Sequence, residues 1–257
     1  MTSKLHCIFV GSCMTMIAPL WLIQGALPSG YVRSHTCLLV GFLNGQIVLA
    51  ADSRSTDPRP GRAAEVVCKL IRTDSFVFGN SGLAYVADVK FDVVANALQA
   101  SRGPGGLEAK VDAFVRSTLD DLRRAVEHLR SREAIAYSFL EKEDTVLSAV
   151  IAGRSGTRPA LFNIEFRWRD GQITTSRPNS PEGTFLGLGR ATAAFAFLGR
   201  TPNFLVGRDI GEAFTTLVEI QARDTPGEVG GPVDIIAVDS SGSRWVRRKS
   251  ACPETTK

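Results

Sequence analysis

The hydrophobic pattern beyond residue 35 alternates between two periods. Short apolar runs, typical of strands, come at the start, middle and end of this region, and stretches with a helical period separate them. The predicted strands are 38–42, 46–52, 65–72, 75–82, 145–152, 160–168, 172–176, 184–186, 232–238 and 244–247. The predicted helices are 83–100, 107–130, 190–198 and one that begins at Asp209. Strands grouped in this way, with paired helices between the groups, favour two stacked sheets with helices on both outer faces.

The first two strands indicate that the sheets are buried on both faces. They meet at Asn44-Gly45, a strong signal for a two-residue hairpin. Ile47, Leu49 and Ala51 point to one side of the second strand and Val48 and Ala50 to the other, so neither face is polar. We therefore expect an α+β fold, a four-layer αββα sandwich with two antiparallel sheets covered by helices.

Composition narrows the classes of function. The 257 residues are 44% hydrophobic, enough for one large domain, and the net charge of +4 comes with no basic run beyond Arg247-Arg248-Lys249. We therefore expect no nucleic-acid partner. The five cysteines at 7, 13, 37, 68 and 252 show no C-x-x-C spacing and do not cluster with the three histidines. We expect no metal, no cofactor and no disulfide scaffold, and we interpret Cys37 as a core residue.

The N-terminal segment has the pattern of a targeting sequence. After Lys4 the chain carries no formal charge until Arg33, and most of the apolar residues in this stretch precede Ala26. Residues 1–26 are predicted to be a signal peptide or a membrane anchor, 27–35 a propeptide or linker, 36–248 the folded domain and 249–257 a C-terminal tail. A cleaved signal predicts a secreted or periplasmic protein, and an uncleaved one predicts a membrane anchor. A cytoplasmic protein with a propeptide is the alternative.

One lysine lies where an apolar residue is expected. In an extended strand Lys69 shares a face with Val67 and Ile71, so it must pair with an acid, have a lowered pKa or extend to solvent. Other polar residues also lie where predicted strands begin or end: Thr36, Asp52, Arg54 and Ser81-Gly82. Strand ends connected by loops are common places for functional sites.

These residues carry a resemblance to a known family. Thr36 precedes "NGQIVLAADSRST" (44–56), Lys69 lies in "CKLI", and "NSGLAYVAD" spans 80–88. Thr36 lies 16 residues before Asp52 and 46 before Gly82. This pattern resembles the N-terminal nucleophile hydrolases, and among them the proteasome beta subunits and the bacterial peptidase that works with an ATP-driven unfoldase. The resemblance extends over most of residues 36–246 and implies the same αββα fold.

The resemblance implies a role for each matched residue. Thr36 is the nucleophile through its hydroxyl, and its own α-amine, once freed by cleavage, is the general base. Lys69 lowers the pKa of that hydroxyl, and Asp52 holds the lysine charged. Gly82 donates its backbone N–H to the oxyanion, and a helix that starts after it adds a favourable dipole.

Two further residues match more loosely. "ARDTPGEVGGPVDIIAVDSSG" resembles the segment before the last hairpin, which makes Asp224 the supporting acid near the terminal amine. Arg54 matches a residue that orders the surroundings of Asp52. "GTFLGLGRATAAFAF" resembles a glycine-flanked helix start.

Three departures leave two functions open. Leu188 stands where the family places a serine against the terminal amine, Gly227 or Val229 stands for a second serine, and His35 replaces the glycine before the cleaved bond. The first reading is a threonine-type peptidase or amidohydrolase, a proteasome-like oligomer activated by removal of its leader. The second is a catalytically inactive proteasome-like subunit that serves assembly or binding.

Each reading predicts its partners. A peptide or small amide is the expected substrate of the enzyme. Both readings imply a homo-oligomer, for which a ring is one arrangement, and a membrane is a partner only if the leader is uncleaved.

Overall fold

The computed structural model describes residues 31–34, 36–55, 65–142, 144–250 and 252–256. The predicted leader, 1–26, lies outside the described residues. No helix within the described ranges is long and apolar enough to cross a membrane.

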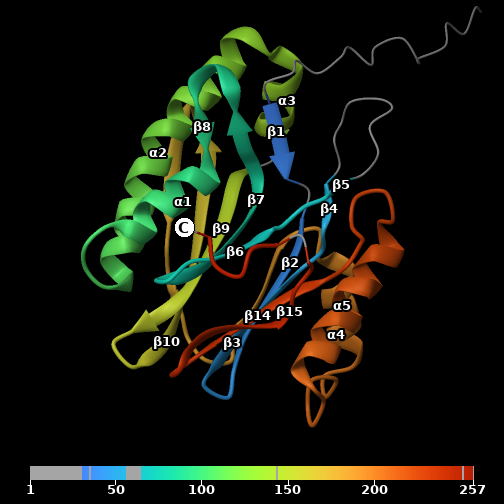
Figure 1. Cartoon of the computed structure of the whole chain (residues 1–257). Coiled ribbons are helices and arrows are strands. Elements are labelled where there is room, and N and C mark those ends of the chain that lie inside the picture. Colours follow the sequence, from blue (N-terminus) through green and yellow to red (C-terminus); the bar gives the residue numbers. More distant parts are fainter. Residues whose placement is uncertain (1–30, 35, 56–64, 143, 251, 257) are drawn as a thin grey trace, which may run out of the picture.

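Two antiparallel sheets form the centre of the protein (Figure 1). The first has the order β1-β7-β9-β10-β11, with β6 and β8 paired to β7 and β12 paired to β10. Its strands are β1 (Tyr31–Ser34), β6 (Leu70–Arg72), β7 (Phe76–Val86), β8 (Phe91–Asp92), β9 (Thr145–Ser155), β10 (Arg158–Arg169), β11 (Gln172–Ser176) and β12 (Asn179–Ser180). The second has the order β13-β2-β3-β14-β15 and consists of β13 (Phe185–Gly189), β2 (Cys37–Leu43), β3 (Gln46–Ala51), β14 (Asp234–Asp239) and β15 (Gly242–Arg247). A small third pair joins β4 (Arg54–Ser55) to β5 (Glu65–Val66).

Helices cover the outer face of each sheet. On the first sheet lie α1 (Val93–Arg102), α2 (Leu107–Arg132), α3 (Ala134–Lys142) and the short 3₁₀ helix η1 (Ala87–Val89). On the second lie α4 (Thr192–Arg200) and α5 (Ile210–Asp224). The predicted α+β, four-layer αββα sandwich is therefore confirmed.

Three hydrophobic clusters correspond to the three interfaces between these layers. One joins α1 and α2 to the first sheet, and one joins α4 and α5 to the second. The third fills the space between the sheets and includes Ile47, Leu49 and Ala51, whereas Val48 and Ala50 belong to the α5 side. The predicted two-sided burial of this strand is correct, because a strand between two layers has no face left for solvent.

The hairpin of β2 and β3 forms as predicted. Asn44 and Gly45 both have positive φ, 51° and 69°, as a two-residue hairpin turn with matching twist requires. The register pairs Leu38 with Ala51, so the start of β2 lies beside the end of β3. The turn thereby brings the residues on either side of these strands, Thr36 and Asp52, to one end of the sheet.

The predicted helix 83–100 is wrong in its first half. β7 continues to Val86 and pairs with β1 and β8, and α1 begins only at Val93, after Asp92 caps it by accepting from the N–H groups of Val94 and Ala95. Leu83 and Val86 are both buried in the cluster that includes α1 and α2. Their spacing of three residues fits a helix as well as an irregular strand. The segment is a strand because β1 and β8 pair with it, and the local sequence pattern does not reveal these partners.

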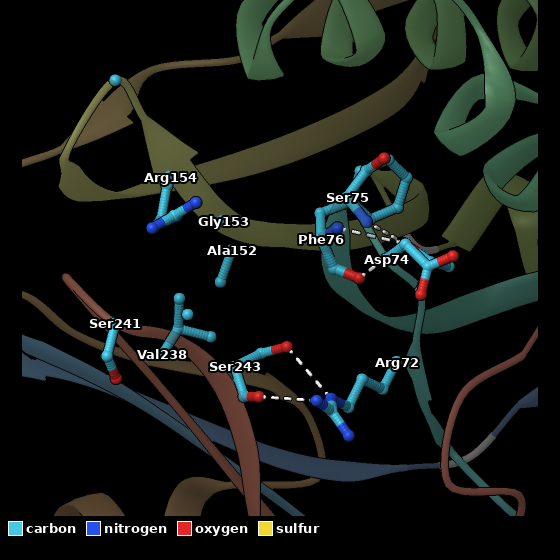
Figure 2. Close-up of a pocket in the computed structure, with 13 residues that line it drawn as sticks. Arg72, Asp74, Ser75, Phe76, Ala152, Gly153, Arg154, Val238, Ser241 and Ser243 are labelled. Carbon is cyan, nitrogen blue, oxygen red and sulfur yellow. Dashed lines mark hydrogen bonds between the residues drawn. The ribbon is translucent and has the colours of Figure 1, made fainter.

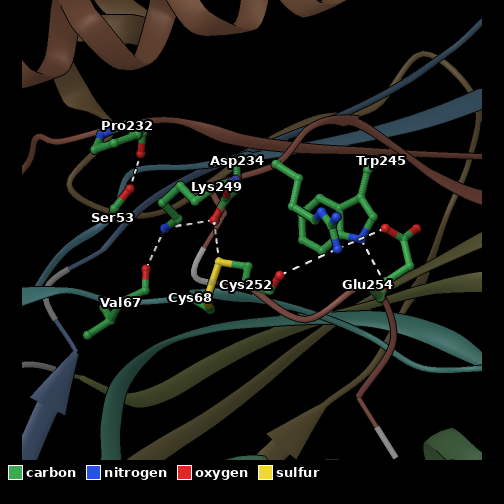
Figure 3. Close-up of a disulfide and its surroundings, with 10 residues drawn as sticks. Ser53, Val67, Cys68, Pro232, Asp234, Trp245, Lys249, Cys252 and Glu254 are labelled. Atoms are coloured by element: carbon green, nitrogen blue, oxygen red, sulfur yellow. Dashed lines mark hydrogen bonds and ion pairs between the residues drawn. A yellow bond between two sulfur atoms is a disulfide. The ribbon is translucent and has the colours of Figure 1, made fainter.

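The C-terminal tail is linked covalently to the domain. Cys68 and Cys252 form a disulfide across a sequence separation of 184 residues (Figure 3). Sequence spacing gave no sign of this bond, because only the fold brings the two positions together. Cys37 is free and buried, as the core interpretation predicted.

We expect the double variant Cys68→Ser/Cys252→Ser to be less stable than the oxidised protein by about 3–5 kcal/mol, because a cross-link over so long a loop restricts the unfolded chain strongly. Denaturant unfolding of both proteins measures this difference. A dithiol reductant should lower the midpoint of the native protein and leave that of the double variant unchanged. Equal midpoints for the two proteins would contradict the expectation.

Candidate active site

Asp52 is the centre of the polar cluster at the end of the sandwich. Its carboxylate is fully buried and accepts hydrogen bonds on both oxygens. Oδ1 accepts from the backbone N–H of Cys37 at 2.9 Å and from Lys69 Nζ at 2.7 Å. Oδ2 accepts from the N–H groups of Arg54 at 3.2 Å and Gly230 at 3.1 Å. One carboxylate thus connects the residue after Thr36, the lysine and a distant loop.

Lys69 is the buried cation of this cluster. Its side chain is 6% exposed and forms an ion pair with Asp52. Burial lowers the pKa of Lys69 below its ordinary value of 10.5, and the charge of Asp52 opposes that shift. The predicted pairing of this lysine with an acid is therefore present.

Thr36 directly precedes β2 and is fully buried. Its carbonyl oxygen accepts from the N–H of Arg190 at 2.8 Å. Gly189, with φ +72°, packs against this carbonyl so closely that a β-carbon would collide with it and would lie 2.6 Å from Ser81 Oγ. Only glycine fits there, and the Ser81 hydroxyl thereby lies near the backbone of Thr36.

Gly82 lies within β7 and does not precede a helix. The predicted dipole of a helix starting after Gly82 is therefore wrong, because the strand continues to Val86. Gly82 has φ +106°, and a β-carbon there would collide with the carbonyl oxygen of Val146. It pairs with Leu147 on one side and with Ser34 of β1 on the other. β1 therefore occupies the edge of β7 at Gly82.

Arg54 orders the loop beside Asp52. Its guanidinium donates to the carbonyl of Pro226 and packs under Gly230, where a β-carbon would lie 3.3 Å from Cζ. The carbonyl of Gly230 accepts from the N–H groups of Ser53 and Arg54, both at 3.0 Å. Arg54 is thus placed where it holds the loop that contributes a donor to Asp52.

Asp224 has its own hydrogen-bond partner at the end of α5. It ends α5 with an exposed carboxylate, whose Oδ2 accepts from Gln221 Nε2 at 3.4 Å. Among the contacts of the described residues, none joins Asp224 to Thr36, Asp52 or Lys69. The chain runs from α5 to the loop at Gly230, and only the tertiary structure shows which of its residues contact the cluster.

Two of the positions that stand for the family's serines, Leu188 and Val229, are apolar, whereas Gly227, the alternative to Val229, is exposed. Leu188 is 4% exposed and packs between the sheets, and Val229 is 1% exposed and packs beneath α5. Both side chains contribute to the hydrophobic core, so the structure gives them no role as hydrogen-bonding groups.

Cys37 is unsuited to act as a nucleophile. Burial, with a smaller contribution from the charge of Asp52, raises the pKa of its thiol to about 12. The thiolate is the reactive form of cysteine, so this side chain is inert at neutral pH.

Two cavities lie at the opposite end of the sandwich. One, of about 390 Å³, lies between the sheets and is lined by Arg72, Arg154 and Ser243 among others (Figure 2). In it the Arg72 guanidinium donates to the side chain and the carbonyl of Ser243. The other, of about 710 Å³, borders the turn at Asn44-Gly45. Neither is lined by Thr36, Asp52 or Lys69, and the described residues contain no cluster suited to hold a metal ion.

Comparisons with known proteins assign no function to the chain. No family model and no curated protein matches the chain. Two similar solved structures are Anbu from Hyphomicrobium sp. strain MC1 and a Gly-1 mutant of it. Each is 18% identical, covers 83% of this chain and 86% of its own, and has a TM-score of 0.48.

The expected assignment to the proteasome beta subunits or the unfoldase-coupled bacterial peptidase is corrected by these findings. No family model matches, and the similar structures named above are of Anbu. The first sequence block carried the resemblance, whereas the later blocks were loose. At this identity the comparison establishes no activity, so the chemistry rests on the geometry of the site.

Proposed function

We propose that this protein is a threonine-type amidohydrolase in which Thr36, once it is the first residue, attacks peptide amides. The observation that carries the proposal is the buried Asp52–Lys69 ion pair, whose acceptor Oδ1 also binds the N–H of Cys37, the residue after Thr36. A buried ammonium is costly, and a pair of hydrophobic residues would serve folding at least as well. The pair's bond to Cys37, the residue that follows Thr36, supports a chemical role.

The proposed reaction uses the chain's own groups. The Thr36 hydroxyl oxygen bonds to the amide carbon, and its proton passes to the α-amine of Thr36 and then to the leaving nitrogen. The Lys69 ammonium stabilises the developing alkoxide, and the N–H of Gly82 is the proposed donor to the oxyanion. Water then hydrolyses the threonyl ester, which restores the hydroxyl.

Processing is part of the proposal. With Thr36 buried and its nitrogen in the peptide bond to His35, the unprocessed chain has neither an accessible nucleophile nor a free base. β1 also covers the edge of β7 at Gly82. Cleavage after His35 and departure of β1 would remove both obstacles and expose a strand edge suited to an extended peptide.

We expect a chain produced with Thr36 as its first residue to hydrolyse small peptide amides, and a matched chain beginning at Tyr31 to be inactive. A fusion partner removed by a protease that leaves Thr36 first would provide the active form. Release of a fluorescent amine measures turnover, and intact mass confirms each N-terminus. Equal turnover by the two chains would contradict the role of the terminal amine.

A second candidate function is an inactive proteasome-like protein that serves assembly or binding. The core position of Leu188 favours it, and so does Gly227 or Val229 at the second position, because none of these residues offers the terminal amine a hydroxyl. A folded chain that begins at Thr36 and hydrolyses no amide would support this candidate.

Export and oligomerisation remain proposals. The Cys68–Cys252 disulfide supports a secreted or periplasmic location, because such bonds persist in oxidising compartments. Terminal sequencing and intact mass of the protein from its own host would report the fate of the leader, the N-terminus and the disulfide together. The predicted homo-oligomer is tested by the mass of that protein in solution.

A further inference from the structure

A second buried ion pair lies close to the proposed site, on the C-terminal tail, here defined as residues 249–256. Lys249 Nζ lies 2.7 Å from Asp234 Oδ2, and the two side chains are 5% and 1% exposed. The N–H of Lys249 also donates to Asp234 Oδ1 at 2.9 Å. Asp234 pairs across the sheet with Ala51, the residue before Asp52. Asp234, the acid of the second ion pair, therefore lies on the strand next to β3, opposite the residue that precedes Asp52.

The tail is attached to the segment that carries Lys69. β5 ends at Val66 and β6 begins at Leu70, so residues 67–69 belong to no strand. Three bonds hold this segment upstream of Lys69, and Figure 3 shows the two that the tail makes. The N–H of Val67 donates to the carbonyl of Ser53 at 2.9 Å, the carbonyl of Val67 accepts from Lys249 Nζ, and Cys68 is bonded to Cys252. The tail supplies two of the three.

We infer that Lys249 is a positioning residue for the proposed reaction: with the Cys68–Cys252 disulfide it holds residues 67–69 so that the Lys69 ammonium meets Asp52 beside Thr36. This inference rests on the proposed function for its catalytic consequence. Without the tail, Val67 and Cys68 would keep, of these three bonds, only the one to Ser53, so the backbone that leads to Lys69 would be held less firmly.

Lys249 also acts on Lys69 through its charge. The groups that act on the Lys69 ammonium are Asp52 from the end of β3, Cys37 from β2 and Lys249 from the tail. The charge of Lys249 lowers the pKa of Lys69 in the same direction as burial does. Loss of Lys249 therefore removes a like charge, and loosening of the segment would admit water. Both changes raise the pKa of Lys69.

The far end of the tail offers a matched control. Glu254 pairs with Arg72 at 2.7 Å and with Arg248 at 2.9 Å, and its side chain is 60% exposed. Its carbonyl accepts from Trp245 Nε1 at 2.9 Å, a bond that a side-chain substitution leaves intact. Glu254→Gln thus removes ion pairs of the same tail without touching residues 67–69.

The test uses the full mature chain. In Asp234→Asn/Lys249→Met both charges are removed together, so no unpaired carboxylate is left in the core, and the asparagine keeps an oxygen for the N–H of Lys249. We expect kcat/KM to fall by about tenfold or more through kcat, with little change in KM, because misplacement of a catalytic group by about 1 Å is costly. The alkaline limb of the pH profile should move to higher pH. Glu254→Gln should match the native chain.

A folded double variant with native kcat/KM and an unmoved alkaline limb would overturn the inference. Cys68→Ser/Cys252→Ser provides a second variant, which keeps the Lys249–Asp234 pair and should show a smaller loss in the same direction. If the cysteine double variant has the native rate and the native pH profile, the positioning role belongs to Lys249 and not to the disulfide. If both variants match the native chain, the inference is refuted.

Labelling of Lys69 separates failure of this inference from failure of the proposed function. Acylation by an amine-selective reagent, followed by peptide mass spectrometry, compares Lys69 with the exposed Lys90 and needs no hydrolytic activity. We expect Lys69 to be protected in the native chain and labelled about tenfold faster in the Asp234/Lys249 variant, since a buried amine reacts only when its surroundings open. Equal labelling would overturn the inference. Absence of hydrolysis by the native chain would count against the proposed function alone.

Discussion

Replacing Thr36 with alanine in the mature chain is expected to abolish amide hydrolysis, with a loss of about 10⁴-fold or more, because removal of a covalent nucleophile leaves only binding and oxyanion stabilisation. The fold should survive. The bond from the N–H of Arg190 to the carbonyl of Thr36 is unchanged by the substitution. Release of a fluorescent amine by chains beginning at residue 36 measures the loss.

Two conservative variants isolate the hydroxyl at this position. Thr36→Val keeps the shape of the side chain without the hydroxyl and should be as inactive as the alanine variant. Thr36→Ser keeps the hydroxyl and loses a methyl group, and it should retain turnover within about 100-fold of the native chain, since the nucleophile is present and only its orientation is less restricted. Undiminished turnover in the alanine variant would refute the role of Thr36 and favour the inactive candidate.

Replacing Lys69 with methionine is expected to lower kcat/KM by about 100- to 1000-fold, because a preorganised charge next to a developing alkoxide is lost. Methionine fills similar space, so the packing between the sheets is preserved. Asp52 keeps its three backbone donors, Cys37, Arg54 and Gly230, which reduce the cost of leaving its charge without the lysine. Unfolding measured in denaturant checks that the variant is folded.

The pH profile distinguishes a chemical role of Lys69 from a structural one. Because burial lowers its pKa, the alkaline limb of kcat/KM in the native chain should lie below pH 10.5, and it should be absent in the methionine variant. The double variant Asp52→Asn/Lys69→Met should be no worse than either single variant, since the two residues act as one unit. A methionine variant with the native rate and the native limb would contradict the proposed chemistry.

Local patterns were sufficient for much of the fold. Asn44-Gly45 predicted the hairpin, and the apolar residues on both faces of β3 indicated a strand between two layers. The apolar residues along one face of 107–130 predicted a helix, and α2 is only two residues longer, ending at Arg132. These features depend on neighbours in sequence, which is why they were predictable. The boundary at Gly82 was not, because β7 continues as a strand only where β1 and β8 are present to pair with it.

The candidate site divides in the same way. The apolar neighbours of Lys69 left three possibilities for its charge, of which pairing with an acid was one, and the resemblance supplied Asp52 as the partner. Three features of the site had no signal in the sequence. They are the hydrogen bond from Gly230 to Asp52, the close packing that requires glycine at position 189, and the exposure of Asp224. Each of them depends on how distant segments meet.

By itself, then, the sequence determined the αββα layers and the residue types of the site, because hydrophobic periodicity and turn chemistry act over a few residues. Only the tertiary structure decided that Asp52 joins Lys69 to the start of β2, that β1 lies on the edge of β7, and that the tail is bonded beside Lys69. These contacts join residues that are far apart in the chain. Their energies come from buried charges and a disulfide, whose partners no local pattern identifies.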